Sequence, residues 1–263
     1  MKKLKRYLAA LLALCLMGVC ACALGEIAVS KRDLTLNREL DKRVNNVLII
    51  MQDGDTTNAM MIASIDSKTG RSVMTNVECA TPVNVSEAGE MTLGDVYALG
   101  DAQSRGYLTA RTVNELLNLN ISTYVALDIS MLPQLVDEIG TLNLWLNEEE
   151  AALLNTWAGD NSLGGEDVLR YVRIRLDSDY REKNRCYMVF MDLLQQGLRR
   201  AGGTNLLGMG KKLLSAMDTN LNPMAAVTML SAFRAGSDRR ELLLMSDMPV
   251  EEMRAAFYKE VYE

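Results

Sequence analysis

Two kinds of apolar spacing alternate along this chain. Residues 46–51 form a continuous apolar run, which is typical of a strand buried on both faces. Residues 59–66 and 71–77 predict two further strands, joined by a turn at 67–70 in which Gly70 supplies the positive φ. Two more strands are predicted later, at residues 122–129 and 141–146.

Helical spacing separates and follows these strands. Asn147 with three acids after it marks one helix start, since acids there complement the helix dipole. The predicted helices cover residues 92–99, 110–119, 131–139, 147–159, 180–200, 206–217, 223–233 and 250–262, with one more strand at 241–245. This alternation predicts an α/β fold with a mixed central β-sheet sandwiched between helices.

Residues 163–186 carry the most distinctive charge pattern. A short helix precedes a predicted strand in which Val172 and Ile174 face one way and Tyr171, Arg173 and Arg175 face the other. Arg185 follows in the next helix. Arginines in this arrangement suit bidentate contact with phosphate, but taken alone this stretch favours a solvated strand face paired with nearby acids. Those acids are Asp177, Asp179 and Glu182.

The N-terminus has the features of an export signal. A basic start precedes an apolar run from Leu8 to about Val19, and residues 21–23 fit the small-x-small cleavage rule. Two alternatives stay open: a lipobox that lipidates Cys22, and a retained membrane anchor across residues 7–24. All three place the domain outside the cytoplasm, secreted or anchored at the outer face of the membrane.

Charge and composition exclude several functions. The formal charge is −6, and removing residues 1–23 lowers it to −10. A domain this acidic lacks the basic surface from which nucleic-acid binding takes most of its affinity. The chain contains no histidine, which excludes histidine-based catalytic triads and histidine metal ligands. Of five cysteines, only Cys79 and Cys186 lie beyond the signal. In an oxidising compartment they suggest one disulfide.

Several segments, in order, resemble the LytR-CpsA-Psr family of cell-wall ligases. The segments are NVLIIMQD, AMMIASIDSKTGRSVMTNV, DVYALG, NELLNLNISTYVALDISMLPQLVDEIGTLNLWL, and LGGEDVLRYVRIR with the later Arg185. The resemblance covers residues 46–217 and implies an extracytoplasmic domain that binds a polyprenyl-pyrophosphate-linked glycan and transfers the phosphoglycan to peptidoglycan. It also implies an apolar tunnel for the polyprenyl tail. The candidates for its lining are Met60, Met61, Leu135 and Leu153, although ordinary core packing explains these residues equally well.

The resemblance also implies roles for individual residues. Asp53 matches the family's first metal-binding aspartate, which would hold Mg²⁺. Arg173, Arg175 and Arg185 match phosphate-binding arginines. With Asp53, Arg173 and Arg175 are therefore the candidate catalytic residues, because metal and arginines stabilise the charge that develops in phosphoryl-type transfer.

Other positions depart from the family pattern. Thr56 and Asn58 stand where the family has Arg and Asp, and residues 78–80 replace Pro-Arg-Asp. Without the second carboxylate we expect Mg²⁺ to bind weakly or not at all, unless Asp55 or Glu78 compensates. Cys79 and Cys186 both fall at changed positions that line one pocket in the family, which implies a disulfide across that pocket. The alternative is two buried thiols.

Three functions follow. The chain is a phosphoglycan transferase, or a catalytically degenerate relative that binds the lipid-linked glycan or a wall-synthesis partner, or an exported domain whose arginines only make structural ion pairs. The expected organisation is a signal peptide or anchor at residues 1–23, a lead-in at 24–45, the α/β domain at 46–218 and a helical extension at 219–263.

Overall fold

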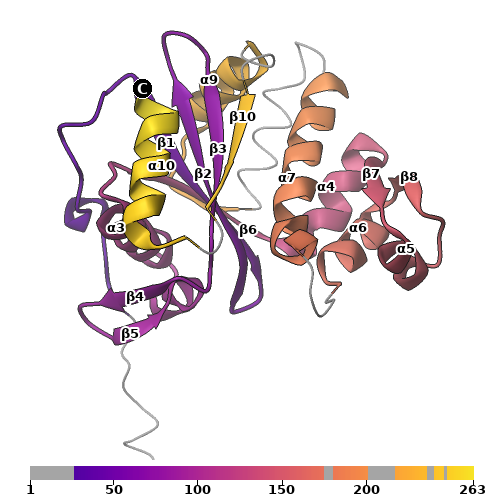
Figure 1. Ribbon diagram of the computed structural model, residues 1–263, viewed down its shortest axis with the longest axis horizontal. Coiled ribbons are helices and arrows are strands. Elements are labelled where there is room, and N and C mark those ends of the chain that lie inside the picture. Colours follow the sequence, from indigo (N-terminus) through magenta and orange to yellow (C-terminus); the bar gives the residue numbers. More distant parts are fainter. Residues whose placement is uncertain (1–26, 175–179, 201–216, 236–239, 246–247) are drawn as a thin grey trace, which may run out of the picture.

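A six-stranded mixed sheet forms the centre of the protein, seen in a computed structural model (Figure 1). The structure describes residues 27–174, 180–200, 217–235, 240–245 and 248–263. The strand order is β10-β3-β2-β1-β6-β9, where β1 pairs in parallel with β6 and β3 in parallel with β10. The strands are β1 Val44–Asp53, β2 Thr56–Asp66, β3 Ser72–Val77, β6 Thr123–Asp128, β9 Asp218–Thr219 and β10 Arg240–Leu244.

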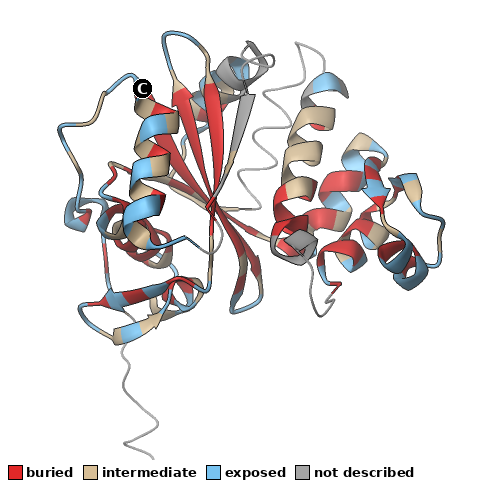
Figure 2. Cartoon of the chain, viewed as in Figure 1, coloured by how far each residue is buried: buried red, intermediate tan, exposed pale blue. Residues whose placement is uncertain are grey.

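Helices cover both faces of this sheet, so two apolar cores form. Successive side chains of β1 point to opposite faces of the sheet, so Leu48 and Ile50 pack in one core and Ile49 and Met51 in the other. The first core lies under α3 (Arg105–Leu117) and α10 (Val250–Tyr262). The second lies under α4 (Leu132–Ile139), α6 (Gly165–Val172) and α7 (Tyr180–Arg200). Buried positions therefore run the length of the central strands (Figure 2), and the predicted sandwich of helices around a mixed sheet is confirmed.

Two small hairpins extend from the main sheet. One consists of β4 (Pro82–Val85) and β5 (Gly89–Thr92), and leads through a 3-10 turn to α2 (Val96–Leu99). The other pairs β7 (Leu142–Leu146) with β8 (Gly159–Leu163), with α5 (Glu148–Leu154) in its loop. The sequence did not predict β4, β5 or β8, which are short and rich in polar residues. It extended the helix after Asn147 too far, because Asn155 ends α5 in the left-handed conformation.

The C-terminal residues are part of the domain rather than an extension of it. β10 completes one edge of the sheet by pairing with β3. α10 is tied to the end of α3, where Arg254 Nε donates to the carbonyl of Leu116 at 2.7 Å and Tyr258 to that of Asn118 at 2.6 Å. α9 (Pro223–Ala235) also packs against β2. The predicted boundary at residue 218 is therefore wrong.

The predicted strand at residues 171–175 is also wrong over residues 171–174, the part of it that the structure describes. Tyr171 and Val172 complete α6, and both are buried on the same side as Val168. The spacing of these three residues at i, i+3 and i+4 is helical, and it prevails over an alternation only a few residues long. The predicted helix at 206–217 and the export signal lie largely outside the described residues. Among the described helices, none combines the length and apolar character needed to cross a bilayer.

Candidate active site

Two acidic residues meet where parallel strands end. Asp53 is the last residue of β1 and Asp128 the last of β6, and Gln52 of β1 is the register partner of Asp128. Ligands in α/β sheets bind beyond the carboxyl ends of the strands. Asp128 was not among the predicted site residues. Its position at the end of a strand beside β1 was the available signal.

Arg173 comes to this edge from α6. Glu166 and Asp167 lie in the first turn of that helix, where they complement its dipole. The chain leaves the helix at Arg173, so the side chain points out of the core with about 45% of its surface exposed. Its Nε donates to Asp53 Oδ2 at 2.8 Å and its Nη2 to Asp53 Oδ1 at 2.6 Å. The pair is bidentate, the geometry in which arginine also holds a phosphate.

Carboxylates dominate the electrostatics around Arg173. The hydrogen bonds that Arg173 donates to Asp53 raise the pKa of the guanidinium, and the charges of Asp128 and Glu166 act in the same direction. One arginine thus faces three acids in the described part of the site. A phosphate that takes the Nε and Nη2 side of the guanidinium must replace Asp53 there.

Arg185 does not reach this edge. Its side chain is fully buried, with Nε donating to Glu150 Oε1 at 2.9 Å and Nη1 to the carbonyl of Ile174 at 3.1 Å. The guanidinium also lies 5.9 Å from the centre of the Tyr171 ring. In this structure Arg185 fixes the backbone just after Arg173 through its hydrogen bond to Ile174. Its side chain is not exposed to a ligand in solution. Of the predicted arginines, Arg175 lies outside the described residues.

The residues present do not fit a bound Mg²⁺. Both oxygens of Asp53 are occupied by Arg173. Asn58 is the extra residue of a β-bulge, since Met51 pairs with Ala59 and Gln52 with Thr57. Within the described chain its Nδ2 is buried without a hydrogen-bond partner, and its amide can offer a cation a neutral carbonyl oxygen but no carboxylate. Nor do any three His, Cys, Asp or Glu residues gather into a metal-binding group in the described ranges.

The structure does not link Cys79 to Cys186 by a disulfide, and the predicted bridge stays a prediction. The two cysteines are nevertheless neighbours. Asn76 Nδ2 on β3 donates to Asn184 Oδ1 on α7 at 3.0 Å. Asn76 precedes Cys79 by three residues and Asn184 precedes Cys186 by two, so this bond holds the two segments together. Burial raises the pKa of the Cys79 thiol to about 12, with Cys186 and Glu78 adding to the shift and a hydrogen bond from the Met60 backbone opposing it.

The four candidates for a polyprenyl tunnel do not share one surface. Met61 and Leu135 enter the core under α4, whereas Met60 enters the core on the other face of the sheet. Leu153 on α5 is about half exposed. As a single lining this set is wrong, because neighbouring residues of a strand point to opposite faces.

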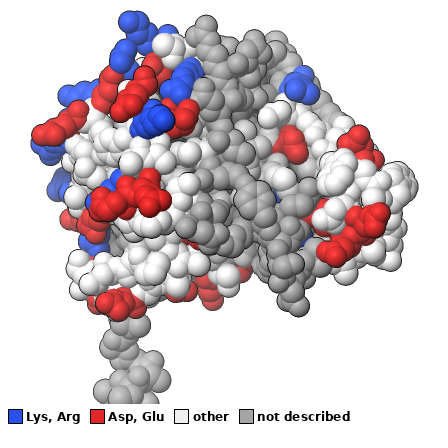
Figure 3. Space-filling view, viewed as in Figure 1, with Lys and Arg blue, Asp and Glu red and all other residues white. Residues whose placement is uncertain are grey.

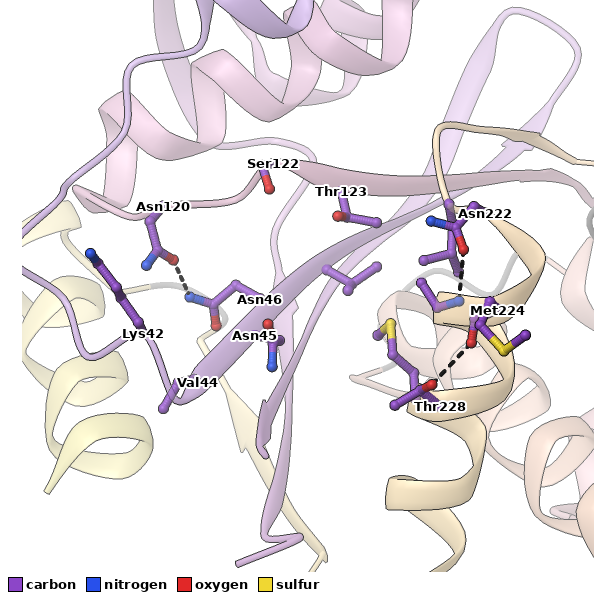
Figure 4. Close-up of a pocket in the computed structure, with 14 residues that line it drawn as sticks. Lys42, Val44, Asn45, Asn46, Asn120, Ser122, Thr123, Asn222, Met224 and Thr228 are labelled. Carbon is purple, nitrogen blue, oxygen red and sulfur yellow. Dashed lines mark hydrogen bonds between the residues drawn. The ribbon is translucent and has the colours of Figure 1, made fainter. Parts of the chain in front are cut away.

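A separate hollow of about 720 Å³ opens at the other end of β1, where the strand begins (Figure 4). Amide and hydroxyl side chains make up half of its lining residues, and some of them already form hydrogen bonds. Asn46 Nδ2 donates to Asn120 Oδ1 at 2.8 Å, and Asn222 caps α9 by accepting from the backbone of Ala225. None of the predicted site residues lies here. The hollow is therefore distinct from the Asp53–Arg173 site.

Comparison with known proteins agrees with this geometry. The LytR_cpsA_psr family matches residues 29–259. The chain belongs to this family. Its match extends past β10 into α10, which agrees with a domain that includes the C-terminal elements.

Two curated proteins are similar in sequence. Biofilm regulatory protein A of Streptococcus mutans is 24% identical over 184 residues, covering 63% of this chain and 43% of the relative. The polyisoprenyl-teichoic acid–peptidoglycan teichoic acid transferase TagU of Oceanobacillus iheyensis is 26% identical over 145 residues, covering 51% and 45%. The matched part of the chain thus spans less than half the length of either relative.

The fold is also shared with solved family structures. The family protein YwtF (TagT), solved with bound octaprenyl pyrophosphate lipid, superposes with a TM-score of 0.66 at 15% identity. The superposition covers 89% of this chain and 99% of that one. At this level of identity the likeness establishes the architecture alone.

Proposed function

We propose that this protein binds a polyprenyl-(pyro)phosphate-linked glycan on the outer face of the cytoplasmic membrane, with Arg173 as the phosphate contact. The observation that carries the proposal is the exposed, bidentate Arg173–Asp53 pair at the carboxyl edge of the sheet in a member of this family. A relative's name, polyisoprenyl-teichoic acid–peptidoglycan teichoic acid transferase, and the lipid in YwtF (TagT) support the ligand class.

In this proposal Asp53 occupies the position on Arg173 that the phosphate takes when the ligand binds. It holds the guanidinium in a fixed, outward-facing orientation, and Arg185 fixes the adjoining backbone through Ile174. A pyrophosphate carries more charge than one carboxylate, and it offers the same bidentate geometry. It therefore takes over Arg173 and releases Asp53, whose carboxylate is then free beside the bound phosphate.

Transfer of the phosphoglycan to peptidoglycan is the second candidate. The family reaction supports it, and a released Asp53 could take part. Two observations favour binding without turnover: Arg185 is buried against Glu150, and the donor set around Asp53 does not fit Mg²⁺. A role at the cell envelope without catalysis agrees with both.

Calorimetry with farnesyl pyrophosphate tests the binding step on the full chain in detergent. Arg173→Ala is expected to weaken binding about 10- to 100-fold, because a charge-assisted hydrogen bond contributes about 1.5–3 kcal/mol. Arg111→Ala is the matched control, since Arg111 also holds a carboxylate, that of Glu87, at 2.7 and 2.8 Å on α3. If Arg173→Ala and Arg111→Ala bound farnesyl pyrophosphate with equal affinity, the proposal would be contradicted.

Turnover is measured separately with a polyprenyl-pyrophosphate glycan and peptidoglycan. Released polyprenyl phosphate that disappears in Arg173→Ala would assign the transferase reaction. Binding that depends on Arg173 without any released product assigns the non-catalytic role. Asp53→Asn distinguishes the two further, because it should tighten pyrophosphate binding if Asp53 only competes for Arg173 and abolish release if Asp53 is catalytic.

A further inference from the structure

Both tryptophans of the chain are exposed on one small unit, the β7–β8 hairpin and its loop. Trp145 on β7 has 54% of its surface exposed, and Trp157, two residues before β8, has 69%. Tryptophan is normally among the most buried residues on average. Its exposure is common where one face of a ring must meet a partner.

Polar side chains share the outer face with Trp145. Burial alternates along β7, so Asn143 and Trp145 both point outward, and their register partners on β8 are Ser162 and Asp160. Ser162 Oγ donates to Asn143 Oδ1 at 2.6 Å. We call these four residues the hairpin platform.

Gln196 of α7 forms hydrogen bonds to the backbone of β7 within the hairpin platform. Gln196 Oε1 accepts from the backbone N–H of Asn143, and Gln196 Nε2 donates to its carbonyl, both at 3.3 Å. The backbone of β7 at Asn143, and the amide and hydroxyl of Asn143 and Ser162, are thus fixed before any ligand arrives. Such preorganisation lowers the entropic cost of binding.

Charge decides which partner fits. Between Arg111 and Arg170 the sequence contains no lysine or arginine, whereas Glu148, Glu149 and Asp160 are exposed around the hairpin. The lobe bearing β7 and β8 shows acidic and uncharged surface in Figure 3. This surface repels phosphate-rich polymers and anionic lipid. It suits an uncharged polymer rich in hydroxyl and acetamido groups.

We propose that the hairpin platform binds an uncharged glycan strand. The indole of Trp145 packs on the C–H face of a sugar ring, while Asp160 and Asn143 accept from and donate to its hydroxyl and acetamido groups. Identifying this strand as the peptidoglycan acceptor rests on the proposed function; glycan binding itself does not. The location is consistent, because β8 leads directly into α6, which ends at Arg173.

Intrinsic fluorescence provides the test, since Trp145 and Trp157 are the two tryptophans of the chain. The full chain with Trp157→Phe is titrated with a soluble N-acetylglucosamine tetramer. We expect a saturable change in Trp145 emission, weakened at least about fivefold by Asp160→Ala, which removes a hydrogen bond of the charged class. Glu252→Ala, an exposed acid on α10, is the control and should leave the titration unchanged.

Four outcomes would overturn the proposal. They are no emission change with the tetramer, a change that Asp160→Ala leaves intact, loss of binding in the Glu252→Ala control, and a change produced by neutral phosphatidylcholine vesicles but not by the tetramer. The last would assign the face to a membrane. Thermal melting of each variant identifies unfolding, and Asp160→Asn offers a milder substitution if the alanine variant melts early.

The same variants separate this proposal from the proposed function. Arg173→Ala should lose farnesyl pyrophosphate binding and keep tetramer binding, and Asp160→Ala should show the reverse. Tetramer binding without any pyrophosphate binding in the parent chain would leave the hairpin platform standing and remove the lipid-binding function. Pyrophosphate binding without tetramer binding would do the opposite.

Discussion

Glu150 and Arg185 form an ion pair with almost no exposed side-chain surface, 0% and 1%. Removing one partner of such a pair leaves a buried charge uncompensated, which costs about 3–5 kcal/mol. We expect Glu150→Ala to lower the free energy of unfolding by that amount in urea denaturation followed by circular dichroism. Glu148→Ala, two residues earlier on the exposed face of α5, should cost less than about 1 kcal/mol. Equal effects of the two variants would contradict a structural role for the pair.

The residue at position 58 should decide whether pyrophosphate binding depends on Mg²⁺. Asn58→Asp restores a second carboxylate beside Asp53, and carboxylate oxygens are the ligands that Mg²⁺ prefers. We expect EDTA to leave pyrophosphate binding by the natural chain within about twofold and to weaken binding by the variant about tenfold, or about 1.4 kcal/mol. Calorimetry with and without EDTA measures both. A strong EDTA effect on the natural chain would show that the site holds a metal without the second aspartate.

Among the elements, the tight packing of α6 on α4 depends on Gly165. A Cβ at that position would lie 2.3 Å from the backbone oxygen of Pro133, so α6 would have to move away from α4. We expect Gly165→Ala to destabilise the fold by about 1–3 kcal/mol, the usual cost of overpacking, and to weaken pyrophosphate binding by displacing Arg173. Gly164→Ala is the control, because a Cβ there meets nothing within 4 Å. Matching melting temperatures for the two variants would contradict this packing.

The elements also show what the sequence can predict. Buried strands and long helices have strong periodic signals: α7 and α10 occupy the predicted residues, and β1 extends its prediction by two residues at each end. The last turn of α6 was assigned to a strand because five residues fit either period. The family resemblance assigned Asp53 to a metal and Arg173 to a phosphate at one site, and the structure brings the two side chains together as an ion pair, which the resemblance did not imply. The burial of Arg185 was not foreseeable, since its partner Glu150 lies 35 positions away.

At the scale of the whole molecule, two proposed binding regions lie on one lobe and its neighbouring sheet edge. The carboxyl edge of β1 and β6 presents Asp53, Asp128 and Arg173, while the β7–β8 hairpin stands out from the helices that cover one face. α6 joins the two, because it begins two residues after β8 and is followed directly by Arg173. A lipid-linked donor and a glycan strand could therefore be held by adjoining parts of one lobe, on a surface fixed by the core beneath α4, α6 and α7.

Buried proton-bearing groups make the whole fold sensitive to alkali. Burial raises the pKa of Tyr262 to about 12 and that of Cys79 to about 12. Burial also raises the pKa of Tyr97 and Tyr124, with the Asp218 carboxylate adding to both shifts, and that of Tyr187. The ordinary values are 10.0 for tyrosine and 9.0 for cysteine, so above about pH 9 the unfolded chain loses these protons first.

Because the folded state binds these protons more tightly, its stability is complete below pH 9 and falls as the pH rises toward 12. We expect the free energy of unfolding to decrease by on the order of 3 kcal/mol between pH 8 and pH 10.5. Urea denaturation at a series of pH values measures it, and the share of tyrosinate absorbance that belongs to these four of the chain's nine tyrosines should appear only as the protein unfolds. Absorbance of all nine tyrosinates with the circular dichroism signal intact would show that these four reach solvent in the folded state.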